Sequence, residues 1–371
     1  MTKKVFIQEK ILDRVKERPG LSAPEIAILC NMSRVSAYQY LTSLIKAGKV
    51  RIDGKGKATR YFIEDFAYAS AHLQGIKIMT PSILHDLKVE IMFFLYEKYE
   101  ESVSEEDMDA SFDKYCMYIT SDNSLITGFD GFVLWCLDPK HGFGERIVEK
   151  AIEYLDIIGT IEYLRAKNGF LDGTETARAN LIDTMQIGFD QFFFCMVSVL
   201  KNGFGSTRTA IELKYGKKNS NQYLLEQAID PWIDSIRTYA TKNNVDACIF
   251  TPPSEGRLVQ FRDVLERRLD IALPKIQASK IPPLGKILEP QKDIRDKTIR
   301  VKNALQSLDL TIPRELSFYK HILILDDSFT TGATPNAIAV RLREAGYTGK
   351  ITIITICGSF DYDLAISEDE I

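Results

Sequence analysis

The spacing of apolar residues along the chain changes twice, and each change marks a region with a different predicted structure. Up to residue 63, apolar side chains recur at helical spacing in three short segments, and two short stretches with strand character follow. Pro19-Gly20 ends the first segment, and Ser22 begins the second with a capping-box pattern. The third segment runs from Arg34 to Lys46. We therefore expect three helices and a β-hairpin over residues 1–63.

Residues 64–210 are predicted to form a helical connector and middle domain. A helix is expected to start at Pro81, and a strongly acidic stretch lies between residues 97 and 113. Several phenylalanines, among them Phe192 to Phe194, supply apolar surface for a core in this region. The longest apolar stretch, residues 192–200, is far too short to cross a membrane.

Residues 211–371 show a third pattern, in which short apolar runs alternate with helical segments. Val245–Phe250, Ile322–Leu325 and Ile351–Cys357 are predicted to be buried strands. This alternation predicts a parallel sheet with right-handed crossovers, in which ligands bind at the carboxyl ends of the strands. We therefore expect a multidomain chain of α+β and α/β class, with a small N-terminal domain, a helical middle and a C-terminal α/β domain.

The charge distribution sets the N-terminal domain apart from the rest. The chain has a net charge of −4, but residues 1–63 hold thirteen Lys and Arg against five Asp and Glu, which is about +8 and leaves about −12 elsewhere. A basic domain on an acidic body indicates nucleic-acid contact. The six cysteines lack metal-knuckle or redox spacing, and the N-terminus lacks the apolar run of a secretory signal. We expect a cytoplasmic protein with free thiols and no membrane partner.

The clearest chemical signal follows the Ile322–Leu325 strand. Asp326 and Asp327 end this strand, and a Thr-Thr-Gly-Ala-Thr loop leads to a helix expected from Pro335 to Ala345, with Thr334 as its cap. Backbone N–H groups of such a loop and helix start converge on an anion, so a phosphate is expected there. The two acids suit ribose hydroxyls or a divalent metal instead. The predicted phosphate-binding residues are Thr330, Thr331, Gly332, Ala333 and Thr334.

This segment closely resembles the phosphoribosyl-pyrophosphate (PRPP) motif of type I phosphoribosyltransferases. In that family the paired acids hold the ribose 2′- and 3′-hydroxyls, and the loop holds the 5′-phosphate. Phe329 stands where a smaller aliphatic residue is more usual. Looser similarity to the ComF-like branch of the family extends over roughly residues 210–360. The resemblance implies a phosphoribosyltransferase-like domain over residues 211–371.

The resemblance also implies ligand contacts outside the PRPP motif. The loop after the first predicted strand corresponds to the family's pyrophosphate-binding loop, although Glu255 departs from the pattern because a carboxylate opposes an anionic ligand. Leu213–Gly216 is similar to a Leu-Lys-Tyr element of the branch, which makes Lys214 a further candidate. The pyrophosphate-loop candidates are Thr251, Pro252, Pro253, Ser254 and Arg257.

The cofactor that the resemblance implies is Mg²⁺, bound together with PRPP. The metal would be held mainly through the ligand, with Asp326 or Asp327 as a protein contact, and not by the protein alone. No catalytic residue is assigned, because catalysis in this family rests on positioning and on charge stabilisation at the leaving pyrophosphate.

The order of elements and charges in residues 1–63 is typical of a winged helix-turn-helix domain. In such a domain the third helix enters the major groove of DNA, and the hairpin contacts the backbone or the minor groove. A domain of this kind can instead bind a protein, but the basic surplus favours nucleic acid. The residues expected to contact nucleic acid are Ser33, Arg34, Ser36, Tyr38 and Gln39 on the helix and Lys55, Lys57 and Arg60 on the wing.

Two functions from different classes fit these features. The first is a nucleic-acid-associated sensor, regulator or effector that binds PRPP or a nucleotide; purine repressors have a similar order of winged helix and phosphoribosyltransferase fold. The second is an active phosphoribosyltransferase, or an enzyme of the reverse transfer, with an unknown acceptor. Proteins joining these two parts also occur in some antiphage retron systems, where the partners would be a reverse transcriptase and a DNA–RNA hybrid. The sequence leaves the acceptor, the nucleic acid and homo-oligomer formation open.

Overall fold

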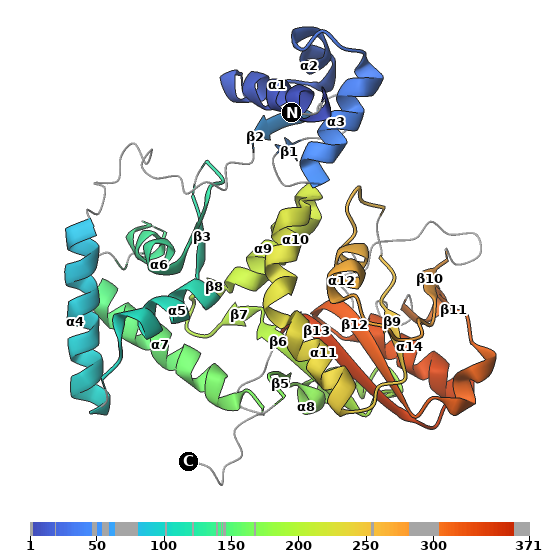
Figure 1. Ribbon diagram of the computed structural model, residues 1–371. Helices are drawn as coiled ribbons and strands as arrows, with labels where there is room; N and C mark the ends of the chain where they lie inside the picture. The colour runs from blue at the N-terminus through green and yellow to red at the C-terminus, as the bar shows by residue number, and fades with distance from the viewer. Residues whose placement is uncertain are drawn as a thin grey trace. The chain divides into compact units, whose positions relative to one another are not determined.

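The computed structural model has a mixed α/β fold (Figure 1). It describes residues 3–18, 20–46, 50–53, 59–63, 81–100, 102–120, 122–138, 140–141, 143, 146–166, 168–253, 256–281 and 304–359. The chain divides into two compact units, which are described separately. The first comprises residues 1–41, 49–163 and 199–211, and the second comprises residues 42–48, 164–198 and 212–371.

The N-terminal segment folds as three helices and an antiparallel hairpin, as predicted. Its elements are α1 (Lys3–Glu17), α2 (Ala23–Leu29), α3 (Arg34–Lys46), β1 (Val50–Asp53) and β2 (Arg60–Ile63). The backbone N–H of Ser22 donates to the Glu25 carboxylate at 2.7 Å, which closes the expected capping box at the start of α2. Leu21 pairs with Tyr61 of β2, so the hairpin is tied to the beginning of α2.

An aromatic cluster forms the core of the remaining first unit. Phe112 of α5 stacks on Tyr154 of α7 with 5.4 Å between ring centroids, and it packs against Phe129 and Phe132 of α6. Phe204, in the turn between β7 and β8, lies 5.2 Å from Tyr154. The elements are α4 (Pro81–Tyr99), α5 (Glu105–Tyr115), β3 (Met117–Ile119), β4 (Leu125–Thr127), α6 (Gly128–Leu137), α7 (Ile147–Leu164), β7 (Val199–Leu200) and β8 (Gly205–Ser206).

The second unit is built on a five-stranded, mostly parallel sheet. Its strand order is β5 (Leu171–Asp172), β6 (Gln191–Val197), β13 (Lys350–Gly358), β12 (His321–Phe329) and β9 (Ala247–Phe250). Strands β6, β13, β12 and β9 are parallel, and only β5 runs antiparallel to its neighbour. Nearly all residues of the parallel strands are buried, which explains their continuous apolar runs. The expectation of a parallel α/β sheet is confirmed.

The second unit also contains residues 164–198, which lie within the predicted helical middle. Strand β6 lies beside β13 in the sheet of the second unit, and Phe192 to Phe194 pack there instead of in the middle region. Phe192 and Phe194 lie 5.0 and 5.1 Å, between ring centroids, from Phe329 of β12. The apolar run of β6 does not reveal its partner, because a parallel neighbour is joined by a long crossover. Here that neighbour is more than one hundred residues further along the chain.

Helices of the second unit pack around the sheet (Figure 1). Asn221 caps α10 by accepting from the backbone N–H of Leu224 at 3.3 Å, and a short 3₁₀ helix that contains Pro231 follows α10. The elements are α8 (Thr174–Leu181), α9 (Arg208–Asn219), α10 (Gln222–Ile229), η2 (Asp230–Trp232), α11 (Ile233–Lys242), α12 (Phe261–Leu269), β10 (Ala278–Lys280), β11 (Leu308–Leu310), η4 (Arg314–Phe318) and α14 (Ala333–Glu344).

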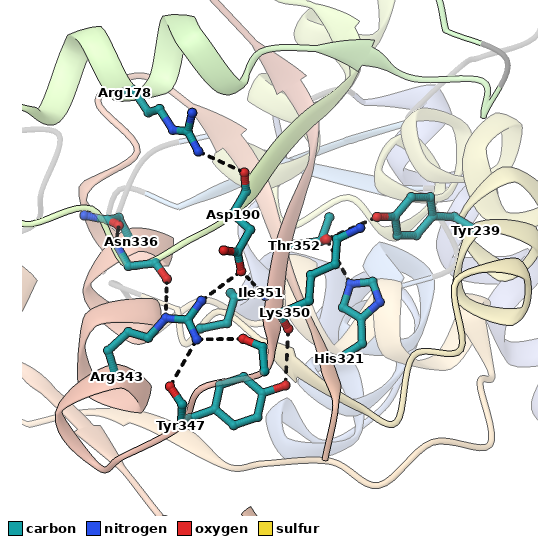
Figure 2. A network of polar contacts seen from close by, with 12 residues as sticks. Arg178, Asp190, Tyr239, His321, Asn336, Arg343, Tyr347, Lys350, Ile351 and Thr352 are labelled. Atoms are coloured by element: carbon teal, nitrogen blue, oxygen red, sulfur yellow. Dashed lines mark hydrogen bonds and ion pairs between the residues drawn. The ribbon is translucent and has the colours of Figure 1, made fainter. Parts of the chain in front are cut away.

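A polar network fixes the amino ends of the central strands (Figure 2). The Arg343 guanidinium donates to the Asp190 carboxylate at 2.8 Å and to the carbonyls of Gly188 and Gly349. Buried His321 lies between the Asn243 carbonyl and the Thr352 hydroxyl, at 3.0 and 2.9 Å from its two ring nitrogens. Burial lowers the pKa of His321. These contacts join α14, β12 and β13 at one end, which leaves the carboxyl ends of the strands for a ligand site.

Candidate functional site

A cavity of about 300 Å³ lies at the carboxyl ends of β12 and β9 in the second unit. Its walls come from α9, the loop after β9, the start of α12, β10 and the loop that joins β12 to α14. The position is the one expected for a ligand site in a parallel sheet. The lining residues are Lys217, Thr251, Pro252, Pro253, Arg257, Gln260, Phe261, Arg262, Lys280, Asp326, Asp327, Ser328, Thr330, Thr331, Gly332, Ala333, Thr334 and Pro335.

The two acids of the motif both face this cavity, but they have different partners. Asp327 accepts from the Lys217 ammonium at 2.8 Å and from the Ser328 hydroxyl at 2.6 Å. Asp326 accepts from the backbone N–H of Asp327 at 2.8 Å, and no described cation lies within ion-pair distance of it. The acid pair therefore contains one neutralised carboxylate and one that is available to a ligand.

The different partners separate the pKa values of the two acids. Burial, followed by repulsion from the Asp327 carboxylate, raises the pKa of Asp326 to about 7. Burial opposes ionisation of Asp327 as well, but the Lys217 ammonium, the Ser328 hydroxyl and the Arg257 guanidinium together hold its pKa below the usual value. Asp326 therefore changes charge near neutral pH, and Asp327 stays ionised.

The loop after β12 lines the cavity. Gly332 has a φ of +71°, and a Cβ atom there would lie 2.6 Å from the ring of Phe329, so only glycine fits. In the described part of the chain, no acceptor pairs with the backbone N–H of Thr331 or Gly332. Backbone donors of this kind beside a helix start are suited to an anion.

The helix after the loop begins earlier than predicted. Helix α14 starts at Ala333 with Gly332 as its N-cap, so Thr334 and Pro335 occupy the first turn instead of the cap and first positions. Proline is tolerated in the first turn because its missing N–H would have no intrahelical acceptor. Phe329, the unusual residue of the motif, is fully buried against the sheet and is not part of the cavity wall.

The loop after β9 supplies the wall next to the acids. Thr251 donates its hydroxyl to the Leu325 carbonyl at 2.9 Å, which ties this loop to the end of β12. Pro252, Pro253 and Arg257 also line the cavity, as expected for the pyrophosphate-loop candidates. Ser254 and Glu255 lie outside the described residues.

The structure places a different lysine of α9 at the cavity from the one that the sequence suggested. Lys214 is exposed and is not part of the cavity wall, whereas Lys217 lines the cavity and pairs with Asp327. A signal was present, because Lys217 follows buried Leu213 by four residues and so shares its inward face.

Outside the motif, four further lining residues were not among the candidates that the sequence suggested. Gln260, Phe261 and Arg262 enter from the start of α12, and Lys280 enters from β10. Burial lowers the pKa of Lys280, and the nearby carboxylates of Asp326 and Asp327 partly offset this effect. No local pattern marks Lys280, because only the tertiary fold brings β10 to the cavity.

The candidate nucleic-acid contacts of the first unit lie where a partner could reach them. Ser33, Arg34, Tyr38 and Gln39 are exposed at the start of α3, and Ser36 is partly exposed. Arg60 is exposed on β2, whereas Lys55 and Lys57 lie outside the described residues. The Ser33 hydroxyl accepts from the backbone N–H of Ser36 at 3.1 Å, which caps the helix.

Comparison with known proteins adds no identification. No protein-family model matches the chain, and no match was found among curated proteins. In the part of the chain that the structure describes, no helix is long and apolar enough to cross a membrane. The described residues also contain no cluster of three or more His, Cys, Asp or Glu side chains that could hold a metal.

Proposed function

We propose that the cavity binds PRPP or a nucleoside 5′-phosphate together with Mg²⁺, and that the protein is a nucleic-acid-associated regulator or effector. The second unit would then be a phosphoribosyltransferase-like domain and the N-terminal segment a winged helix. The observation that carries this proposal is the convergence of acid pair, Thr-Gly loop and cations on one cavity.

The charges around the cavity favour a ligand with more than one phosphate. Among the described lining residues, two carboxylates face four cations, which are Lys217, Arg257, Arg262 and Lys280. One phosphate can bind the N–H groups of the Thr331–Ala333 loop, and the cations of the opposite wall can neutralise a second anionic group. Asp326 and Asp327 precede the loop and line the same cavity. They are suited to sugar hydroxyls, because an ionised carboxylate only accepts hydrogen bonds.

The residues present fit Mg²⁺ that is shared with the ligand. Mg²⁺ prefers oxygen ligands and in phosphate sites uses one or two carboxylates plus phosphate oxygens. Asp326 has no cation partner among the described residues and offers such an oxygen. When bound, the metal would neutralise charge at a leaving pyrophosphate.

The alternative function is an active phosphoribosyltransferase, or reverse ribose-phosphate transfer, on an unknown acceptor. The surplus of cations supports it, since pyrophosphate must be stabilised as it leaves. An antiphage retron effector, partnered with a reverse transcriptase and its DNA–RNA product, is one form of this alternative.

The proposal can be tested with two lysines of α9, of which Lys217 lines the cavity and Lys214 does not. PRPP with Mg²⁺ is titrated calorimetrically into wild-type protein, Lys217→Met and Lys214→Met, and pyrophosphate release is then assayed. We expect Lys217→Met to weaken binding about tenfold or more, the value of one charged hydrogen bond, and Lys214→Met to match wild type. Equal affinities for all three proteins would refute the site. Pyrophosphate release would favour the enzyme, and binding without release would favour the regulator.

A further inference from the structure

Helix α4 of the first unit is bound to its neighbours by charged as well as apolar side chains. Lys88 is only 15% exposed and pairs with Glu105 and Asp109 of α5 at 3.1 and 2.6 Å. Lys98 pairs with Asp156 of α7 at 2.5 Å. The helix is thus attached to its neighbours partly through charged side chains, although an amphipathic helix normally turns these to solvent.

Ile91 and Leu95 of α4 are buried, but other large apolar side chains of this helix are exposed. Phe93 and Tyr96 are each 56% exposed, and Phe94 is 41% exposed, with Ile83 and Val89 exposed as well. We call these five residues the α4 apolar face. Aromatic side chains gathered in this way on one helix mark an interaction site, because isolated proteins rarely expose contiguous apolar patches.

A groove runs beside this face. It has a volume of about 520 Å³ and is formed by Leu87, Glu90 and Phe94 of α4 with the start of α7. The apolar residues of its α7 wall are Ile147, Val148 and Ile152. Most of its lining residues are apolar, so the groove can accept apolar anchor residues of a partner helix.

A row of acidic residues borders the groove and divides the apolar face. Asp86, Glu90 and Glu97 are exposed, and their spacing of four and seven places them in one row along α4, between Phe94 on the groove side and Phe93 on the other side. On the opposite side of the groove, Glu149 is paired with Arg146. The α7 wall therefore adds no net charge. The described rim is negative overall.

We infer that the α4 apolar face and its groove bind an amphipathic helix of a partner protein whose apolar stripe is flanked by Lys or Arg. The negative rim selects this occupant by charge complementarity. A second copy would place the same acids against one another, because a two-fold interface brings identical patches together. An anionic membrane surface would be repelled by the same rim. The inference does not depend on the function proposed for the cavity.

The test selects peptides that bind to the full-length chain. A displayed library of helical peptides carries a fixed apolar stripe with Lys, Gln or Glu at the flanking positions. Selected peptides are measured by fluorescence anisotropy against wild type, against Phe93→Ser with Phe94→Ser, and against Glu90→Lys with Glu97→Lys. Phe318→Ser is the matched control, because Phe318 is an equally large exposed side chain in the second unit.

The expected result is enrichment of Lys-flanked peptides that bind wild type and the control alike. The serine variant should bind them about tenfold or more weakly, and the lysine variant should prefer Glu-flanked peptides. Because the exchanged side chains are exposed, circular dichroism should show unchanged helix content. The inference would be overturned if the enriched peptides showed no preference for Lys at the flanking positions. It would also be overturned if wild type enriched no peptides beyond those that the serine variant enriches. The inference would likewise be overturned if wild type formed a dimer and the serine variant were monomeric. Binding of wild type, but not of the serine variant, to anionic lipid vesicles would overturn it as well.

Discussion

The titration of Asp326 should make ligand binding depend on pH in a way that a single substitution removes. With a pKa of about 7, Asp326 is roughly one-eleventh ionised at pH 6 and ten-elevenths ionised at pH 8. Ribose hydroxyls and Mg²⁺ both favour the ionised carboxylate, so the contribution of Asp326 to affinity should rise about tenfold between these pH values. At pH 8, Asp326→Asn loses a charged hydrogen bond worth about 1.5–3 kcal/mol, or roughly 10- to 150-fold in affinity.

The assay is calorimetric titration of PRPP with Mg²⁺ at pH 6, 7 and 8 into wild type and Asp326→Asn. PRPP changes its own charge in this range, but that effect is common to both proteins and cancels in their affinity ratio. The ratio should shrink about tenfold from pH 8 to pH 6. Asp327→Asn removes the repulsion that helps to raise the pKa of Asp326, so in this variant the step should move to lower pH. A wild-type to Asp326→Asn ratio that is constant with pH would show that Asp326 does not titrate at the ligand.

Three further outcomes are expected. Burial lowers the pKa of His321, so the native state binds fewer protons than the unfolded state, and the melting temperature should fall as pH drops below about 6.5; His321→Gln should flatten this fall, and identical pH profiles of the two proteins would contradict the assignment. Neutralising Arg34 and Arg60 should reduce the slope of log affinity for duplex nucleic acid against log salt by about one per lost phosphate contact, and an unchanged slope would favour protein docking by the N-terminal segment. Saturating PRPP should change nucleic-acid affinity about 5- to 150-fold, with an equal reciprocal effect on PRPP affinity, whereas equal affinities would indicate independent modules.

Local patterns were sufficient for several elements and for the central motif. The capping box at Ser22 and the apolar run before Asp326 depend on residues close together in sequence. The start of α14 was misplaced by two residues, because the left-handed conformation of Gly332 begins the helix before Pro335. Helix boundaries depend on single backbone conformations that residue preferences constrain only weakly.

The sequence by itself determined the chemistry of the motif: two acids at the end of a buried strand, followed by a loop that must contain glycine and then by a helix start. It also determined the basic surplus of residues 1–63, because charge depends on composition alone. The tertiary structure decided which side chains join the motif. It placed Lys217 against Asp327, brought Lys280 from β10 to the cavity and inserted β6 beside β13. Parallel neighbours and cavity walls come from segments far apart along the chain, and their contacts depend on the whole packed sheet, which short-range periodicity does not encode.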